Sequence, residues 1–265
     1  MRIFEVPEGS KTSKGRAIQN LINIEQDDRV KAFICTQDLK DEEYVNSNYV
    51  IMATKMGQVK KTSLEQYSRP RSNGINAITI KEGDELLAAK LTNGNSQIML
   101  AVQSGKAIRF EESKTRPMGR NASGVRGIRL KDSKDVVVGM ISVNDMDANI
   151  LVVSENGYGK RSSLEDYRLT NRGGKGVKTI SITEKTGKLV TLKSVSDNDD
   201  LMIINKSGIA IRMQVEDLRV MGRATQGVKV ISIKDGDSIA AVAKVMKDDD
   251  DLEDINEIEF TGDSV

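Results

Sequence analysis

The stretch LVVSENGYGKR at residues 151–161 decides the fold, because it contains an apolar strand, a turn and a basic strand in eleven residues. Three other segments have the same arrangement: IMATKMGQVKK at 51–61, MLAVQSGKAIR at 99–109 and MIINKSGIAIR at 202–212. Their turn glycines, Gly57, Gly105, Gly157 and Gly208, are 48, 52 and 51 residues apart. A regular period of this length predicts a repeat architecture.

A second pattern follows each of these segments. It reads SNGINAI, ASGVRGI, GKGVKTI and TQGVKVI around Gly74, Gly124, Gly176 and Gly227, and a fifth copy, SKGRAIQ, surrounds Gly15. Each unit contains four short β-branched segments, such as ILVVS, YGKRSS, GVKTISI and KLVTLKSV. Alternating Val and Ile between Gly, Asn and Asp turns is typical of strands, and a period of about 50 residues is typical of propellers. We therefore predict an all-β, propeller-like array of about five repeats with four strands each.

The repeats set the expected boundaries. Residues 1–48 are expected to form an incomplete first blade, and blades are expected at 49–97, 98–149, 150–200 and 201–246. Residues 247–265 are expected to be an acidic, disordered tail, because nine acids and no basic residue follow Lys247. The rest of the chain then carries all 40 Lys and Arg but only 30 of the 39 acids. A basic body of this kind favours a polyanionic partner.

Several chemistries are excluded or disfavoured by the sequence. The chain has no histidine and one cysteine, Cys35, which we expect to be a buried small hydrophobe because it lies in the apolar run AFIC. The stretch NRGGKG at 171–176 is not a nucleotide-binding loop, because Gly176 and a strand-like segment stand where Ser or Thr and a helix are required. The run DMDAN at 145–149 lacks the glycine and the last glutamate of a calcium loop. No apolar run is long enough for a membrane span, and no signal peptide is visible, so a cytoplasmic protein is expected.

Cations recur at corresponding positions of the repeats, and we predict that they form a curved track of positive charge along the rim. A duplex is favoured over a single strand as the ligand, because nine Phe and Tyr are too few to line a stacking groove. The predicted DNA-binding residues are Lys14, Arg16, Lys60, Lys61, Arg69, Arg71, Arg109, Arg116, Arg120, Arg126, Lys160, Arg161, Arg172, Lys175, Lys178, Arg212, Arg223 and Lys229.

The repeats resemble the C-terminal domain of DNA gyrase A, a β-pinwheel that wraps DNA. The resemblance covers residues 1 to about 246 and is carried by PEGSKTSKGRAIQNLI, ENGYGKRSSLEDY and VMGRATQGVKVI. That family has a box, Q-[RK]-R-G-G-K-G, in its first blade, and RGGKG at 172–176 matches its end, with Thr170 and Asn171 in place of the first two residues. The blade order implies that the true box lies upstream of Met1, so that the chain resembles a domain cut within its second blade.

The resemblance implies a function and partners. The implied function is non-sequence-specific binding, bending and wrapping of duplex DNA in support of ATP-dependent negative supercoiling. The implied partners are duplex DNA, the remainder of the gyrase A protein and the gyrase B protein, and no membrane is implied. The implied location is the cytoplasm, in association with the nucleoid. The Arg-Tyr pair of the cleaving domain is absent, so the chain is not expected to be an enzyme by itself. No cofactor is expected in this chain, because ATP and Mg²⁺ would belong to other parts of the holoenzyme.

Three alternatives stay open. The first is the C-terminal domain of topoisomerase IV, which is similar but lacks the intact box. A propeller used as a protein-interaction scaffold would need exposed apolar or aromatic hot spots, which the composition does not favour. A propeller enzyme would need convergent carboxylates or a metal site, and none is visible. The isolated domain is expected to be a monomer.

Overall fold

The computed structural model describes residues 3–10, 13–14, 16–22, 24, 28–71, 73–234 and 236–246. The segment before the first strand contains the short helices η1 (Ile3–Glu5), η2 (Ile18–Asn20) and α1 (Glu42–Ser47), and its described residues form no strand. From Tyr49 to Met246 the described residues form mainly strands, with the short helices η3 (Leu64–Tyr67), η4 (Glu112–Lys114) and η5 (Leu164–Asp166) between them, so the all-β prediction is confirmed. The acidic tail lies outside the described residues.

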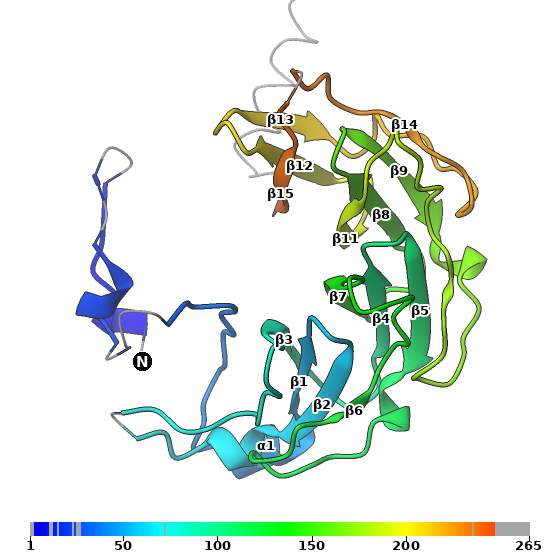
Figure 1. Cartoon of the computed structure of the whole chain (residues 1–265). Coiled ribbons are helices and arrows are strands. Elements are labelled where there is room, and N and C mark those ends of the chain that lie inside the picture. Colours follow the sequence, from blue (N-terminus) through cyan, green and yellow to red (C-terminus); the bar gives the residue numbers. More distant parts are fainter. Residues whose placement is uncertain are drawn as a thin grey trace, which may run out of the picture.

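The described residues form four antiparallel sheets, which follow one another along an open arc (Figure 1). Each sheet contains a central hairpin and an inner strand that returns along the first strand of that hairpin. The first two sheets contain β1 (Tyr49–Thr54), β2 (Gln58–Ser63), β3 (Leu86–Thr92), β4 (Gln97–Val102), β5 (Lys106–Glu111) and β7 (Val137–Val143). The last two contain β8 (Asn149–Ser154), β9 (Tyr158–Ser163), β11 (Leu189–Val195), β12 (Asp199–Asn205), β13 (Ala210–Gln214) and β15 (Ile239–Met246).

Each hairpin turns at the glycine that the sequence singles out. Gly57, Gly105, Gly157 and Gly208 have φ between 78° and 88°, a region that only glycine adopts without strain. The Gly57 N–H donates to the Thr54 carbonyl over 3.0 Å, which closes a tight turn, and Gly105 makes the same bond to Val102 over 2.9 Å. The predicted strand–turn–strand units are therefore hairpins.

The fourth strand of a sheet comes from the next repeat, and not from the same repeat as the sequence pattern indicated. β6 (Val125–Arg126) pairs with β2, β10 (Val177–Lys178) with β5, and β14 (Val228–Lys229) with β9. These donated strands are only two residues long, so most of GVKTISI, expected to be a strand, is irregular. Each donated strand ties two consecutive repeats together. The last sheet, β13-β12-β15, has three strands in the described part of the chain.

The core lies between the sheets. Alternate residues of each first strand face the two neighbouring sheets: Ile98 and Leu100 pack back onto Ile51 and Ala53, whereas Met99 and Ala101 pack forward. The two middle sheets of the arc therefore have two apolar faces each. Burial of these apolar side chains between neighbouring sheets fixes the order of the sheets along the arc. Cys35, expected to be buried, is exposed, because residues 28–36 form no strand and only Ala32 and Ile34 of that segment are partly buried.

Candidate nucleic-acid interface

Four of the predicted DNA-binding cations lie inside the protein. The side chains of Lys60, Lys61, Lys160 and Arg161 belong to residues with 0, 4, 0 and 7% exposure. A phosphate oxygen cannot reach a charged group that is enclosed by protein atoms. The structure therefore contradicts the prediction for these four residues, and the reason is that the protein's own polar groups surround them.

Lys60 and Lys160 support loops of the outer rim from below. The Lys60 ammonium donates to the carbonyls of Ala77 and Arg120, and Lys160 Nζ donates to the Gly222 carbonyl over 2.5 Å and to Thr225 Oγ1 over 3.1 Å. Burial lowers the pKa of each of the two ammonium groups to about 8. The nearby Arg120 lowers the pKa of Lys60 further, while at Lys160 the Asp166 carboxylate opposes the shift and Arg223 adds to it.

Lys61, Arg109 and Arg161 connect one repeat to the next. Each stands four residues after a turn glycine, and each reaches the short helix or turn of the following repeat. Lys61 Nζ pairs with Glu112 Oε1 over 3.0 Å, Arg109 Nη1 donates to the carbonyls of Leu164 and Tyr167 over 2.8 and 3.0 Å, and Arg161 Nε donates to the Leu218 carbonyl. These cations satisfy buried acceptors at the junctions. Arg109 is half-buried, and its guanidinium stabilises the junction between two repeats, whereas the sequence predicted that it would bind DNA.

A row of exposed cations lies on the donated strands. Arg126 is the second residue of β6, Lys178 of β10 and Lys229 of β14, and each stands two residues after the glycine of the second pattern. All three are exposed. Because the donated strands form the outer edges of consecutive sheets, these cations recur once per repeat on the outer side of the arc (Figure 1). We call Arg126, Lys178 and Lys229 the rim row.

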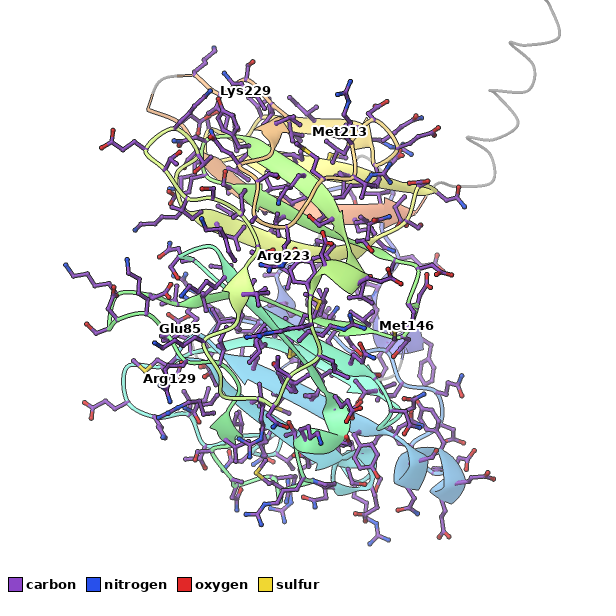
Figure 2. All side chains as sticks on the ribbon, turned by 90° about the vertical axis from the view of Figure 1, so that its right-hand side faces the viewer. Glu85, Arg129, Met146, Met213, Arg223 and Lys229 are labelled. Carbon is purple, nitrogen blue, oxygen red and sulfur yellow. The ribbon has the colours of Figure 1, made fainter. Side chains whose placement is uncertain are left out.

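A second row of cations lies in the loops that precede the donated strands. Arg120, Arg172 and Arg223 each stand four residues before the second-pattern glycine. Arg172 Nη1 donates to the Arg126 carbonyl over 3.1 Å, and Arg223 Nη1 donates to the Lys178 carbonyl over 3.0 Å. The guanidinium groups of Arg172 and Arg223 are thus fixed on the donated strand of the preceding repeat, beside a member of the rim row. The outer side of the arc, with Arg223 near its middle and Lys229 near its top, faces the viewer in Figure 2.

The other predicted cations differ in their placement. Arg69, Arg71, Arg116 and Lys175 are exposed in loops that lead to second-pattern segments, as expected. Arg212 is exposed on β13 and forms an ion pair with Asp200 Oδ2 over 2.6 Å. Lys14 and Arg16 are exposed, but they belong to the segment before the first sheet and do not continue the rim row.

The sequence reasoning missed several exposed arginines, among them Arg129, Arg168 and Arg219. Arg129 lies just beyond β6 and is labelled on the outer side in Figure 2, and Arg168 follows the helix η5 (Leu164–Asp166). Arg129 stands five residues after Gly124, where the other repeats carry Ser181 and Ser232, so comparison between repeats gave no signal for it. Arg168 lies where Ser68, Arg116 and Arg219 stand in the other repeats, and this recurrence of arginine was the available signal.

The described residues offer few signs of other chemistry. Among them, no group of three His, Cys, Asp or Glu side chains is placed to hold a metal ion. No helix in the described part of the chain is long and apolar enough to cross a membrane.

Comparison with known proteins identifies the family. The model of the DNA gyrase C-terminal domain, a β-propeller, matches residues 1–37, 48–93, 97–144, 148–196 and 199–246. This chain belongs to that family. The five matched segments follow the repeats, and the last four contain the four sheets described above.

Relatives and solved structures agree with this assignment. The chain is 45% identical over 248 residues to the A subunit of DNA gyrase from Staphylococcus epidermidis, and 44% identical over 249 residues to that from Staphylococcus aureus. These alignments cover 93 and 94% of this chain but 27 and 28% of the relatives, so the chain spans little more than a quarter of their length.

The solved structures establish the fold. A DNA gyrase A C-terminal domain superimposes with a TM-score of 0.76 at 25% identity, covering 88% of this chain and 76% of the other. The C-terminal domain of a DNA topoisomerase IV gives a TM-score of 0.81 at 24% identity, covering 94% of this chain and 76% of the other. The second likeness concerns the fold alone.

Proposed function

We propose that this chain binds duplex DNA along the outer side of the arc, without reading sequence, and bends it there. The observation that carries the proposal is the rim row, because Arg126, Lys178 and Lys229 occupy one structural position in three consecutive sheets. Cations spaced regularly along a convex surface fit the phosphates of a duplex that follows that surface.

The second row of cations, Arg120, Arg172 and Arg223, supports the same proposal. Arg172 and Arg223 each donate a guanidinium N–H to a backbone carbonyl, and this bond holds the guanidinium in place at the surface. Fixed donors lose less side-chain entropy when they bind a phosphate than mobile lysines do. Lys60 and Lys160 contribute indirectly, since they hold the loops that carry Arg120 and Arg223. We therefore leave Lys60, Lys61, Lys160 and Arg161 out of the proposed contact surface.

Bending follows from the shape of the binding surface. Bending a short duplex costs roughly 1 to 6 kcal/mol, and contacts spread over three successive sheets offset that cost only if the DNA curves with them. In the gyrase family such a domain would present a DNA segment to the rest of the gyrase A protein, with ATP and Mg²⁺ used by other parts of the assembly with the gyrase B protein. The location proposed for this activity is the bacterial cytoplasm, at the nucleoid.

A triple variant tests the rim row. Arg126→Ala with Lys178→Ala and Lys229→Ala should lower the slope of log affinity against log salt by about 3, since each lost phosphate contact removes about 0.9. The matched control is Lys90→Ala with Lys193→Ala and Lys244→Ala, which removes the same charge from the inner strands β3, β11 and β15.

Comparing the two triple variants shows whether DNA affinity depends on the rim row or on the net charge of the protein. The inner-strand control should keep a slope of log affinity against log salt near that of the wild type. It should also bend DNA as much as the wild type does in an end-to-end fluorescence transfer assay. If both triple variants lost the same slope, net charge and not the rim row would determine binding, and the proposal would be wrong.

A further inference from the structure

A groove with a basic lining crosses the end of the second sheet, where the β4–β5 hairpin turns. It has a volume of about 450 Å³ and lies between this turn, the loop after β6 and the segment from β10 to the start of β11. Ile180 and Ile182 supply the apolar part of its lining. Small-molecule sites in proteins have volumes of about 300 to 1,000 Å³, so the groove has room for a small ligand. Five lysines line it: Lys106, Lys131, Lys134, Lys178 and Lys188.

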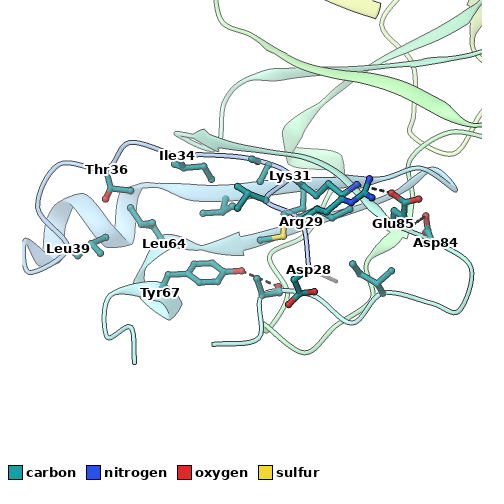
Figure 3. Close-up of a pocket in the computed structure, with 18 residues that line it drawn as sticks. Asp28, Arg29, Lys31, Ile34, Thr36, Leu39, Leu64, Tyr67, Asp84 and Glu85 are labelled. Carbon is teal, nitrogen blue, oxygen red and sulfur yellow. Dashed lines mark hydrogen bonds and ion pairs between the residues drawn. The ribbon is translucent and has the colours of Figure 1, made fainter. Parts of the chain in front are cut away.

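The five ammonium groups are unpaired in the part of the chain that the structure describes. None of them forms an ion pair or a hydrogen bond with a described residue. A second cavity shows the contrast. It has a volume of about 820 Å³ and lies beside the first sheet, and there Lys31 Nζ pairs with Glu85 Oε2 over 2.9 Å (Figure 3). The groove at the second sheet therefore presents cations that are free to bind a ligand.

The two aspartates of the groove are bonded to the protein's own groups. Asp135 Oδ1 accepts from the Ser104 N–H over 3.0 Å, and its Oδ2 accepts from Ser104 Oγ over 2.7 Å and from the Lys131 N–H over 3.1 Å. Asp132 Oδ1 accepts from the Lys134 N–H over 2.9 Å. These bonds tie the loop to the hairpin turn, so the backbone that carries two of the lysines is fixed before a ligand arrives. Five lysines against two aspartates leave three positive charges in the groove.

Three of the five lysines have no counterpart in the other repeats. Lys134 lies in the turn DSKD, which is one residue longer than the corresponding turns EGD at 82–84 and DGD at 235–237. Lys106 directly follows the turn glycine, where the other hairpins have Gln58, Tyr158 and Ile209. Lys188 directly precedes β11, and the residues before β3, β7 and β15 are Glu85, Val136 and Ser238. A contact with DNA that follows the arc would recur from sheet to sheet, as the rim row does, so these lysines indicate a site of a different kind.

We propose that this groove binds an oligophosphate, a chain of three or more phosphate groups that belongs either to inorganic polyphosphate or to a nucleotide. Lysine ammonium groups are common phosphate ligands, and every phosphate group offers strong acceptor oxygens. Such a ligand matches the three uncompensated charges, whereas a single carboxylate would leave most of the lysines unpaired. A duplex fits the convex outer side of the arc, but it is too wide to enter a groove of about 450 Å³.

The groove meets the proposed DNA surface at one residue. Lys178 lines the groove and is also a member of the rim row. A bound oligophosphate should therefore remove one DNA contact and lower the slope of log DNA affinity against log salt by about 0.9. This consequence rests on the proposed function, whereas oligophosphate binding itself does not. A chain that failed to bind DNA would still be expected to bind the oligophosphate.

A triple variant tests the groove without changing the rim row. Lys106→Gln with Lys134→Gln and Lys188→Gln removes the three lysines that are specific to this sheet. The matched control is Lys81→Gln with Lys206→Gln and Lys234→Gln, which removes the same charge from exposed lysines near the hairpin turns of the first and last sheets. Circular dichroism and a thermal melt verify that both variants fold. Lys134→Glu, a single change in an exposed turn, replaces the groove variant if the latter does not fold.

Isothermal titration calorimetry at low ionic strength measures binding, with inorganic tripolyphosphate as the probe. We expect one tripolyphosphate to bind per chain. The groove variant should lose at least about tenfold in affinity, and the control variant should stay within about twofold of the wild type. ATP without Mg²⁺ is the second probe. Tighter binding of ATP than of tripolyphosphate would identify a nucleotide as the source of the oligophosphate, and equal or weaker binding would identify inorganic polyphosphate.

Three results would overturn the proposal. The first is a wild type that does not bind tripolyphosphate at low ionic strength. The second is a groove variant that binds tripolyphosphate as tightly as the wild type does. The third is an equal loss of affinity in the groove variant and the control variant, because the net charge of the protein would then explain the binding.

Discussion

Lys60 and Lys160 occupy the same place in two repeats, three residues after the turn glycine, and each ends beneath a rim loop. The second sheet of the arc has Ile108 there, and a Cβ added at Gly174 of the corresponding loop would lie 3.4 Å from the Cδ1 of Ile108. A long aliphatic stem and a short aliphatic side chain thus fill the same space, and the ammonium adds hydrogen bonds to carbonyls at the end of the stem. The lowered pKa of the lysines indicates that burying their charge is costly.

That cost predicts a pH dependence for Lys160. Below its folded pKa of about 8, Lys160 is protonated in both the folded and the unfolded chain, so it contributes no slope. Between about 8 and its ordinary pKa of 10.5, the unfolded chain holds more protons, so stability rises with pH.

Lys160→Met keeps most of the stem and removes the titration. The free energy of unfolding of the wild type should rise by about 1 kcal/mol relative to this variant between neutral pH and a pH of about 9.5. Urea titrations of both proteins over that range measure it. Parallel pH profiles for the two proteins would show that the Lys160 charge is not destabilised by burial.

The buried lysines and arginines show a limit of prediction from the sequence. Adjacent cations such as Lys160 and Arg161 point to opposite faces of a strand, and a charged pair next to a turn is typical of an exposed hairpin. What buries them is the following repeat, which supplies carbonyls more than 50 residues away. By contrast, Arg126, Lys178 and Lys229 were correctly expected to be exposed, because an edge strand of two residues leaves their side chains outside.

At the scale of the element, the hairpin and its donated strand form the unit of the fold. The period of the turn glycines predicted the hairpins, because a strand–turn–strand pattern is local. The origin of the fourth strand could not be predicted, since a segment such as GVKTI has the same pattern whether it pairs with its own sheet or with the preceding one. The exchange makes each sheet depend on its neighbour for an edge.

This dependence predicts unequal effects at equivalent glycines. Gly105 and Gly208 have φ of +82° and +88°, and Asn tolerates that region at both sites. Only at Gly105 would the new Cβ meet the next repeat, 2.8 Å from the Ile180 carbonyl. Gly105→Asn should therefore cost about 2 kcal/mol more than Gly208→Asn, as overpacking does. Thermal and urea unfolding at low protein concentration compare them, and equal costs would mean that the junction yields without strain.

The loops before the donated strands should also be equivalent to one another. RGGKG at 172–176 ends like the family's box, but its Arg172 sits at the position of Arg120 and Arg223 and makes the same kind of backbone contact as Arg223. We expect Arg172→Ala with Lys175→Ala to lower the salt slope of DNA affinity by up to about 2, and Arg120→Ala with Arg126→Ala to do the same. If only the 172/175 pair abolished binding or bending, this loop would be the dominant wrapping element.

At the scale of the whole molecule, charge and curvature are arranged together. The donated strands with their cations lie on the outer side of the arc, and β3, β7, β11 and β15 lie on the inner side (Figure 1). The number and order of the repeats follow from the sequence period, but the open shape does not, because closure depends on contacts between repeats that are far apart in the chain.

The acidic tail opposes this surface in charge. Residues 248–265 carry nine acids, whereas the residues before them hold ten more bases than acids. A tethered polyanion is present at high local concentration and competes with DNA phosphates for the same cations, and added salt screens both interactions.

Truncation after Met246 should therefore tighten DNA binding at low salt, by roughly five- to tenfold, and the gain should shrink as the ionic strength rises. The control keeps the length of the tail and replaces its nine acids by Asn or Gln, so that only charge changes. Fluorescence anisotropy with a labelled duplex over a salt series measures all three proteins. If the charge-neutral tail weakened binding as much as the natural one, steric exclusion and not charge would be its mode of action. If truncation left the affinity unchanged at low salt, the tail would not engage the rim, because a polyanion that competes with DNA must lose its effect when it is removed.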